Sequence, residues 1–384
     1  MIVKERMIMK KMLRSVALML AMVMLVSIIQ PMEVNAATKK KTTYLLSGIT
    51  LDVSNRYYSV KEIEKYINLA AKQKNGYVQL HLTGDNAVGI ECQYLGQVAK
   101  TKYRRKNGAY YNPKTGKCFL SRKEIKTILT YAKKKKVMIV PEIDMPGHVG
   151  GFEKLYIKKY GKTNAKIFHA DYEGELAIKN KQAIKFAKNI YNEYAKLFKG
   201  CKYFHIGCDE FWSGSAKQNA SYINTISKYM QKKGFRVWAW NDLFTKTNMK
   251  SINKKIMVTY WSYDGDTTDA TERKERRKVR ATLPELQAKG FSVLNYNSYY
   301  LYLTPNKKNV SKADTTYAVN DAKANWSIRM WDGDSGSKCK TAKRIVGACV
   351  SIWGEDSKGV KAGSIYQQVA KLYPVLQKKC IIKK

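Results

Sequence analysis

The stretch KKKKVMIVPEIDMPGH, residues 133–148, contains the elements that decide the fold. Its four lysines suit the C-terminus of a helix, where the helix dipole favours cations. The apolar run VMIVPEI (137–143) predicts a strand that is buried on both faces. Glu142, Asp144 and His148 lie at the end of that strand. A helix followed by a buried strand with reactive side chains at its carboxyl end indicates an α/β protein.

The same alternation continues on both sides of this stretch. Seven more short apolar runs predict strands at 48–53, 77–82, 203–207, 235–240, 255–261, 291–296 and 346–353. Amphipathic segments separate most of them, and Ser59 with Glu62 matches the capping box that begins a helix. Ser121 and Glu124 repeat that signature. Eight such units without an interrupting linker favour a single (β/α)8 TIM barrel over two doubly wound domains.

The first 36 residues predict a secretory signal peptide. Basic residues precede the apolar run SVALMLAMVMLVSII (15–29), and a polar stretch then ends at Ala36. The apolar run is shorter than the ~20 residues that a spanning helix needs, so cleavage and export are expected. An uncleaved membrane anchor is the alternative. Residues 37–47 are predicted as a basic linker and 48–384 as the barrel domain.

Lysine and arginine number 71 against 30 acidic residues, which gives a formal net charge of +41. Hydrophobic residues make up 45% of the chain, and this excludes a disordered polycation. Such a charge suggests either a nucleic-acid binder or a protein that works among anionic polymers. Since no nucleic-acid motif is present, we expect no specific nucleic acid as a partner. Electrostatic association with anionic wall or matrix polymers is expected instead, with no membrane contact after signal cleavage.

The cysteines do not predict a disulfide scaffold. There are seven, with no C-x-x-C pair, and the odd number leaves at least one thiol unpaired. A bridge between Cys92 and Cys118 is an open alternative. The sequence does not predict an oligomeric state.

Active sites of (β/α)8 barrels lie at the C-terminal ends of the strands, so the side chains there are the candidate site. Carboxylates, imidazoles and aromatic rings gather at these positions. They are His81, Asp85, Glu142, Asp144, His148, His205, Asp209, Glu210, Trp240, Asn241, Asp242, Trp261, Tyr296, Tyr299, Tyr300, Trp353 and Glu355. Adjacent carboxylates beside aromatic faces indicate glycosidic bond cleavage, in which one carboxyl is the general acid.

A metal-dependent hydrolase is a competing interpretation of the three histidines. No His-x-His pair occurs, and His81, His148 and His205 come from different predicted strands. We therefore expect neither a metal ion nor another cofactor.

Eight motifs, in this order, resemble those of the family 20 glycoside hydrolases, the β-N-acetylhexosaminidases. They are LDVSNRYYS (51–59), HLTGD (81–85), PEIDMPGH (141–148), FHIGCDE (204–210), WND (240–242), YWSYDGDT (260–267), LNYNSYYLY (294–302) and SIWGED (351–356). The resemblance spans about residues 48–380 and implies a glycoside hydrolase catalytic domain. The last three motifs are most similar to those of secreted depolymerases of poly-β-1,6-N-acetylglucosamine, which implies a polysaccharide of the biofilm matrix as substrate.

The resemblance also implies a mechanism in which the 2-acetamido carbonyl of the substrate is the nucleophile. Glu210 is the implied general acid, and Asp209 would orient the acetamido N–H and stabilise the cationic intermediate. Asp85 and His148 match a hydrogen-bonded relay near the acid. The implied substrate-binding residues are Arg56, Trp240, Asp242, Trp261, Tyr300, Trp353 and Glu355. Because the acid must be protonated near neutral pH, we expect a desolvated site or an acidic neighbour that raises its pKa.

Two features depart from the family or stay open. Cys208 stands where the family usually has a glycine, and its side chain is expected to crowd the end of the strand. The acidic stretch YDGDTTDATE (263–272) has two interpretations. It forms a cleft rim that favours partly de-N-acetylated, cationic polymer, or it is a helix N-terminus that RKERRK (273–278) neutralises.

Two other functions stay open at this point. One is an exo-acting β-N-acetylhexosaminidase for oligosaccharides derived from chitin, glycans or peptidoglycan. The other is a carbohydrate-binding or wall-adhesion protein that keeps the fold without catalysis. Intact Asp209 and Glu210 favour an enzyme over the second of these.

Overall fold

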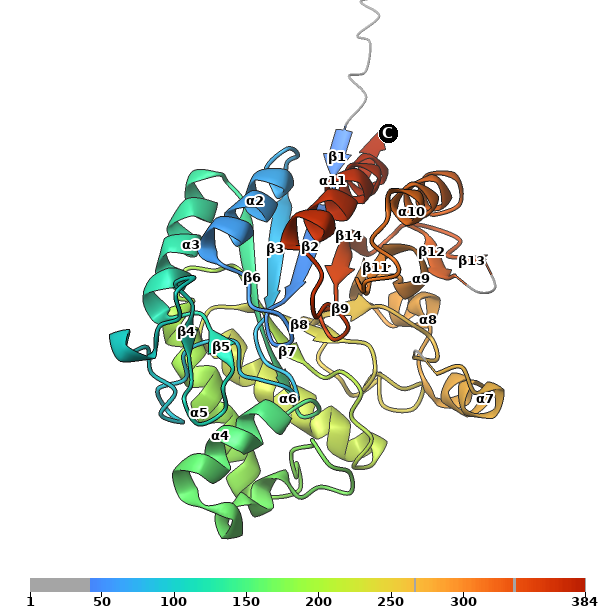
Figure 1. Ribbon diagram of the computed structural model, residues 1–384. Coiled ribbons are helices and arrows are strands. Elements are labelled where there is room, and N and C mark those ends of the chain that lie inside the picture. The colour runs from blue at the N-terminus through green and yellow to red at the C-terminus, as the bar shows by residue number, and fades with distance from the viewer. Residues whose placement is uncertain (1–41, 266, 334–335, 384) are drawn as a thin grey trace, which may run out of the picture. The chain divides into compact units, whose positions relative to one another are not determined.

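Parallel strands form a closed barrel in the computed structural model, which describes residues 42–265, 267–333 and 336–383 (Figure 1). The barrel strands are β2 (Leu46–Asp52), β3 (Gly76–His81), β6 (Met138–Met145), β7 (Tyr203–Gly207), β8 (Arg236–Trp240), β9 (Met257–Tyr260), β10 (Ser292–Asn295) and β14 (Ile345–Ile352). Each strand pairs with its neighbour, and β10 also pairs with β14, which closes the sheet. The eight predicted strands and the single (β/α)8 barrel are thus confirmed.

Helices surround this barrel on the outside (Figure 1). They are α2 (Val60–Ala70), α3 (Arg122–Lys134), α4 (Gly150–Tyr160), α5 (Lys181–Leu197), α6 (Ala216–Lys232), α7 (Ala270–Val279), α8 (Leu283–Ala288), α9 (Ser298–Leu301), α10 (Lys312–Ala324) and α11 (Ala362–Lys379). The loops add η1 (Thr101–Tyr103), η2 (Lys162–Phe168), β4 (Tyr110–Tyr111), β5 (Cys118–Phe119), β11 (Tyr302–Leu303), β12 (Met330–Asp332) and β13 (Ser337–Lys338). The predicted capping boxes begin α2 at Ser59 and α3 at Ser121.

The inside of the barrel is filled by aromatic rings. Tyr77, Trp238, Trp240 and Tyr296 are all fully buried there. Gly48 on β2 makes room for this packing, because a Cβ at that position would lie 2.0 Å from the Tyr77 ring. The interior is therefore a solid core, and only its C-terminal end can hold a ligand.

The folded domain begins earlier than predicted. β1 (Thr42–Tyr44) pairs with β15 (Ile381–Lys383), and β2 begins at Leu46. The predicted linker 37–47 is therefore too long at its C-terminal end, because residues 42–44 and 46–47 form strand hydrogen bonds. The predicted signal peptide, residues 1–36, lies outside the described residues.

Two predictions about the wider chain can be compared with the described part. No helix among the described residues is long and apolar enough to cross a membrane. All seven cysteines, which lie within the described part of the chain, are free thiols, and a bridge between Cys92 and Cys118 is absent.

Strand register places a row of polar residues across one end of the barrel. Asp52 pairs with His81, His81 with Glu142, and Glu142 with His205 along β2, β3, β6 and β7. Parallel strands in this register bring residues that are far apart in the sequence to one level. This level is the floor beneath the candidate site.

Candidate active site

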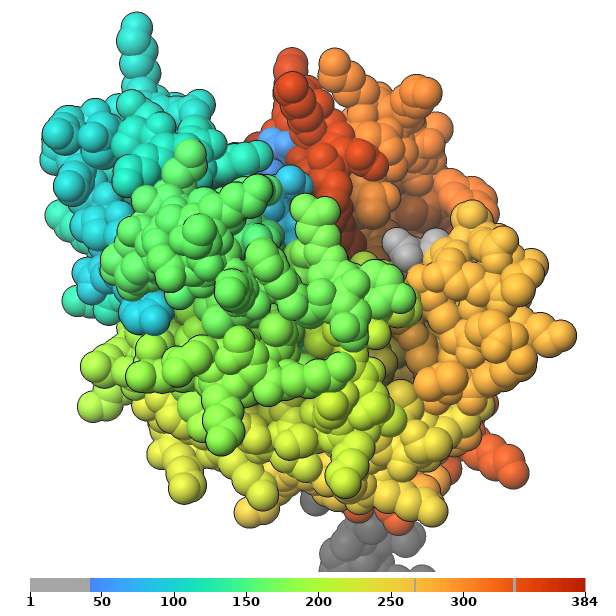
Figure 2. Space-filling view, turned by 90° about the horizontal axis from the view of Figure 1, so that it is seen from below, coloured from blue at the N-terminus to red at the C-terminus, as the bar shows by residue number. Residues whose placement is uncertain are grey.

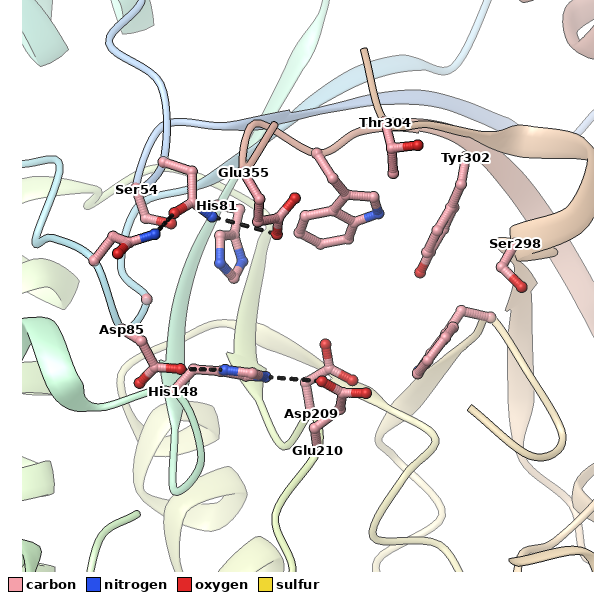
Figure 3. A pocket seen from close by; sticks show the side chains of 15 residues that line it. Ser54, His81, Asp85, His148, Asp209, Glu210, Ser298, Tyr302, Thr304 and Glu355 are labelled. Carbon is pink, nitrogen blue, oxygen red and sulfur yellow. Dashed lines mark hydrogen bonds and ion pairs between the residues drawn. The ribbon is translucent and has the colours of Figure 1, made fainter. Parts of the chain in front are cut away.

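A cavity of about 370 Å³ opens at the C-terminal end of the barrel. Figure 2 looks onto this end and shows the surface hollowed between the green, red and orange parts of the chain. The side chains of the cavity are shown in Figure 3. Those lining it are Ser54, Asn55, His81, Gly84, Asp85, Asn86, His148, Asp209, Glu210, Trp261, Ser298, Tyr302, Thr304, Trp353 and Glu355. Eight of the predicted site residues are in this set: His81, Asp85, His148, Asp209, Glu210, Trp261, Trp353 and Glu355.

The predicted relay is present as a chain of contacts across the cavity wall (Figure 3). His148 Nδ1 lies 2.8 Å from Asp85 Oδ2, and His148 Nε2 lies 3.6 Å from Glu210 Oε2. The Gly150 amide donates to Asp85 Oδ1 at 3.0 Å. Burial disfavours a protonated His148, but its contacts with Asp85 and Glu210 raise its pKa well above the usual histidine value. The imidazolium is therefore held between two carboxylates.

The pKa values of the two central carboxyls are shifted in opposite directions. Burial raises the pKa of Asp209 well above its ordinary value, and the nearby carboxyls of Asp242, Glu210 and Asp144 add to this effect. Burial also acts to raise the pKa of Glu210, but the ion pair with His148 and the more distant charges of Arg280 and Arg276 hold it below its ordinary value.

The expectation that this site raises the pKa of Glu210 is therefore wrong. Its acidic neighbour is present, but the pKa of that neighbour, Asp209, is the one that is raised, whereas the contact with His148 lowers the pKa of Glu210. A ligand that donates a hydrogen bond to Asp209 would favour the ionised form of that residue. Ionised Asp209 would in turn raise the pKa of Glu210, because two adjacent carboxylates repel each other.

A strained backbone turn presents this pair. Gly207, Cys208 and Glu210 have φ values of +74°, +76° and +36°. A positive φ is ordinary for glycine but costs energy at the other two residues. Cys208 is fully buried beneath the turn, and the departure from glycine is seen in its positive φ, a backbone conformation that is costly for a cysteine. Such strain is found at functional sites where the surrounding structure enforces it.

Three aromatic rings form the wall opposite the carboxyl pair. Trp261 and Tyr302 stack at 5.9 Å with an interplanar angle of 10°, and Tyr302 lies 5.5 Å from Trp353. Aromatic faces of this kind suit the apolar C–H face of a sugar ring. The floor is completed by His81, whose ring lies edge-on to Trp353 at 5.3 Å.

Tyr302 lines the cavity, whereas Tyr300, the predicted substrate-binding tyrosine, is not among the lining residues. Tyr300 lies within the short helix α9, where its ring packs on Tyr299 at 4.7 Å and lies toward Asp321 of α10. The chain then enters β11, which pairs with the end of β14 and directs Tyr302 inward. A sequence with several tyrosines in one segment cannot show this change from helix to strand.

The predicted role of Arg56 in binding substrate is not supported by its position. Its guanidinium donates to the backbone oxygens of Ser357 at 3.0 Å and Val360 at 2.9 Å and so fixes the loop after β14. The neighbouring Asn55 lines the cavity and donates to Glu355 Oε1 at 3.3 Å. Thus an amide, not a guanidinium, accompanies Glu355 at this end of the cavity.

Trp240 and Asp242 support the site from below and do not line the cavity. Trp240 is fully buried, and its indole N–H donates to Glu142 Oε1 at 2.6 Å. Asp242 accepts from the indole N–H of Trp261 at 2.7 Å and pairs with Arg280 at 2.8 Å. Asp242 thereby fixes the orientation of one wall ring.

The described part of the acidic stretch follows the helix N-terminus interpretation. Asp264 is buried and pairs with Arg273 at 2.9 Å and Arg277 at 2.8 Å. Asp269 is the N-cap of α7, and Glu272 pairs with Arg276. Asp266 lies outside the described residues. These three acids therefore fit the helix N-terminus interpretation better than the cleft-rim interpretation, because helical arginines pair with two of them and the third caps the helix.

Two clusters among the described residues have the donor atoms to hold a metal ion. They are His81 with Glu142 and Asp144, and Asp144 with His148 and Asp209. In both clusters the imidazoles are already paired with carboxylates, at 3.1 Å for His81 and Glu142. A metal ion would have to displace these pairs, so the donor set fits proton and charge handling better than metal binding.

A family model described as the glycosyl hydrolase family 20 catalytic domain matches residues 44–364. The chain belongs to glycosyl hydrolase family 20. The predicted resemblance is thereby confirmed, and the cavity lies where a family 20 barrel presents its strand ends.

Relatives within family 20 differ in length. Lacto-N-biosidase of Bifidobacterium bifidum is 27% identical over 351 residues, covering 84% of this chain and 27% of its own. Beta-hexosaminidase 1 of Coccidioides posadasii is 23% identical over 379 residues, covering 86% of this chain and 59% of its own. The chain therefore spans less than two thirds of either relative.

Among solved structures, dispersin B is similar along nearly its whole length. It has a TM-score of 0.84 and 36% identity, covering 87% of this chain and 99% of that chain. A catalytic module of the pneumococcal exo-β-D-N-acetylglucosaminidase StrH has a TM-score of 0.66 and 19% identity, covering 86% of this chain and 83% of that chain. The second likeness shows the family 20 fold alone.

Proposed function

We propose that this protein is a secreted, retaining β-N-acetylglucosaminidase that hydrolyses poly-β-1,6-N-acetylglucosamine of a biofilm matrix. The observation that carries the proposal is the Asp209–Glu210 pair, with His148 beside it, facing the wall of Trp261, Tyr302 and Trp353. Family membership supports the activity. The linkage is supported by the motif resemblance to secreted depolymerases and by the 36% identity with dispersin B.

In the proposed first step, the acetamido carbonyl oxygen bonds to C1 while the C1–O bond to the next sugar breaks. Glu210 gives its proton to the leaving oxygen, and Asp209 accepts a hydrogen bond from the acetamido N–H and stabilises the positive oxazolinium ring. In the second step water attacks C1, the bond to the acetamido oxygen breaks, and Glu210 takes the proton from water. Two inversions at C1 give net retention.

His148 and Asp85 hold Glu210 in place during both steps. His148 contacts Asp85 at 2.8 Å and Glu210 at 3.6 Å, and these contacts orient Glu210 toward the cavity. Tyr302 lies where its hydroxyl can donate to the acetamido oxygen, since it stacks on Trp261 within the cavity. These residues orient groups whose charge changes during the reaction, which favours the transition state.

The test uses poly-β-1,6-N-acetylglucosamine and β-1,4-linked chitin oligomers, with product lengths read by mass spectrometry. We expect the wild type to shorten the β-1,6 polymer, and Glu210→Gln to lose turnover while still binding it. Turnover of chitin oligomers alone would support the exo-acting hexosaminidase. Binding by the wild type without any release of N-acetylglucosamine would support the carbohydrate-binding protein. Activity is expected to survive excess chelator, and its loss would favour the metal-dependent alternative.

Export and electrostatic retention belong to the same proposal. The predicted signal peptide, residues 1–36, would export the enzyme and be removed, leaving 66 basic and 28 acidic residues, a net charge of +38, to meet anionic wall and matrix polymers. Mass spectrometry of the extracellular protein tests export. An N-terminus that still contains residues 15–29 would contradict cleavage.

A further inference from the structure

We propose that the segment between β3 and α3, together with the end of α4, binds the phosphate groups of a polyol-phosphate polymer. Residues 93–120 form the basic excursion of this site. Its cavity shares no lining residue with the cavity at Glu210. The inference does not depend on the proposed glycosidase activity. It assigns to one place the retention by anionic polymers that the net charge alone would spread over the whole surface.

The basic excursion has an unusual charge for its length. It contains seven lysines and arginines, all within KTKYRRKNGAYYNPKTGK (100–117), and no aspartate or glutamate. None of the seven side chains forms an ion pair with a carboxylate in the described part of the chain. The excursion therefore presents positive charge that its own residues do not neutralise, which is the feature that attracts a polyanion.

These charges are carried by a folded segment. Its short strands β4 and β5 pair antiparallel, and the Arg105 guanidinium donates to the backbone oxygen of Gly116 at 2.9 Å. Arg104 lies over the Tyr110 ring at 5.3 Å and Arg105 over the Tyr111 ring at 5.4 Å. Figure 2 shows this part of the chain in blue-green, projecting at the upper left. A fixed segment loses less conformational freedom when it binds a ligand.

A cavity of about 370 Å³ lies between the basic excursion and α4. Two lysines of the excursion, Lys100 and Lys114, and two of α4, Lys158 and Lys159, line it. No acidic side chain among the described residues does so. Four ammonium groups from two separate elements thus surround one concave space, which suits an anion that enters it.

The cavity also offers a neutral hydrogen-bond donor. Asn112 lines it and is 8% exposed. Its Nδ2 donates to Gln97 Oε1 at 3.0 Å, and its Oδ1 accepts from the Lys114 amide at 2.9 Å. Gln97 is held in turn by two backbone oxygens, at 2.7 Å and 2.8 Å. Because a primary amide has two N–H donors, one donor of Asn112 is left for an oxygen of the ligand.

The carboxylates around the excursion have other partners. Glu193 accepts from two backbone amides at 2.7 Å and 2.9 Å and pairs with Arg122 at 3.4 Å. Glu62 and Glu124 complete the capping boxes of α2 and α3. None of these three acids lines the cavity. They do not compete with a ligand for its four lysines.

The cavity favours a flexible phosphodiester chain with small units. Ammonium groups suit phosphate oxygens as point charges, and the Asn112 amide suits a hydroxyl or phosphate oxygen. A space of about 370 Å³ is at the small end of ligand sites, so a polyol-phosphate unit enters it and a rigid DNA duplex does not. Tyr103, Tyr110 and Tyr111 each have a cation over one ring face, so these rings are poor platforms for stacked bases.

The test measures binding of poly(glycerol phosphate) by isothermal titration calorimetry at about 0.1 M salt. The site variant combines Lys100→Gln, Lys114→Gln and Lys158→Gln. Lys159 is left unchanged, because its ammonium also donates to the backbone oxygen of Tyr94 at 2.5 Å. We expect the site variant to bind about tenfold more weakly than the wild type, since three exposed ion pairs are lost. Its affinity should also depend less on salt, with a log–log slope shallower by about two.

The matched control combines Lys126→Gln, Lys133→Gln and Lys134→Gln, which removes the same charge from exposed positions of α3. We expect this control to bind nearly as tightly as the wild type. Equal affinities of the two triple variants would overturn the site and leave only a general effect of net charge. Arginine at the three site positions should restore binding, and a failure to do so would overturn the role of charge.

Single-stranded and duplex DNA of matched charge identify the ligand. We expect the wild type to bind poly(glycerol phosphate) more tightly than either DNA. Tighter binding of DNA that the site variant loses would overturn a polyol phosphate as the ligand. Since no measurement here uses glycoside hydrolysis, failure of the site is distinguishable from failure of the proposed function, which Glu210→Gln tests.

Discussion

At the scale of single residues, Cys208 shows that the site contains a strained backbone conformation. It has a φ of +76° and is fully buried directly before the carboxyl pair. Cys208→Gly should release backbone strain of about 1 kcal/mol and lose a similar amount of thiol burial. We expect hydrolysis to stay intact and the free energy of unfolding to change by less than about 1 kcal/mol. A complete loss of activity in this variant would contradict a role limited to packing, and Cys208→Val, which adds branching, should be destabilised.

A matched pair of tyrosines tests the corrected assignment. Tyr302 lines the cavity beside Trp261, whereas Tyr300 lies near α10. Tyr302→Phe should lower kcat about 100-fold, the typical loss of one donor to a developing charge. Tyr300→Phe removes the same hydroxyl from the same segment and should stay near wild-type activity. Steady-state kinetics on one substrate decide the matter, and the reverse order would restore the sequence-based assignment.

At the scale of elements, one buried carboxylate ties together strands β3, β6, β7 and β8. Glu142 accepts from Gln79 at 2.7 Å and Trp240 at 2.6 Å and pairs with His81 at 3.1 Å. Burial opposes its ionisation, but the charges of His205 and His81 and the hydrogen bonds to it lower its pKa to about 2. Glu142→Gln would leave a buried charge without its partner. We expect a loss of about 3 kcal/mol in the free energy of unfolding, measured with denaturant.

The same pair predicts how stability depends on pH. Burial opposes protonation of His81, but Glu142 raises its pKa to about 9 from 6.5. The stability that this pKa shift of His81 contributes is fully present below pH 6.5 and is lost as pH rises through about 9. The contribution of Glu142 is present above pH 4.5 and is lost as pH falls through 2. Both slopes should weaken in Glu142→Gln and persist in Glu124→Gln, a helix-cap control. Unchanged slopes in Glu142→Gln would contradict the assignment.

The elements also show where sequence reasoning succeeded and where it stopped. The barrel strands and the caps at Ser59 and Ser121 were predictable, because burial and capping follow local patterns. Asp209 and Glu210 were predictable as strand-end neighbours. Arg56 and Tyr302 were not placed correctly, because the direction of a loop side chain depends on contacts with residues far along the chain. Arg56, for example, donates to Ser357, which is about 300 positions away. The pKa order of the carboxyl pair likewise depends on His148 and Asp242, from other strands.

At the scale of the whole molecule, the net charge of +38 that remains after removal of residues 1–36 predicts retention that depends on salt. Contacts with anionic wall or matrix polymers are screened over about 8–10 Å at physiological ionic strength. We expect the fraction of enzyme bound to the walls to fall steeply between about 50 mM and about 500 mM salt, because the Debye length shortens over this range. Sedimentation of enzyme with isolated walls measures it. Retention that is independent of salt would contradict electrostatic association, and Glu210→Gln should be retained as the wild type is.

The pairing of β1 with β15 has a practical consequence. These strands lie at the N-terminal end of the barrel, because β1 leads directly into β2, whereas the cavity lies at the opposite end (Figure 1). A support attached before Thr42 or after Lys383 would therefore be on the side of the barrel away from Glu210. An immobilised coating built in this way would present its clefts outward, toward any polymer that settles on it.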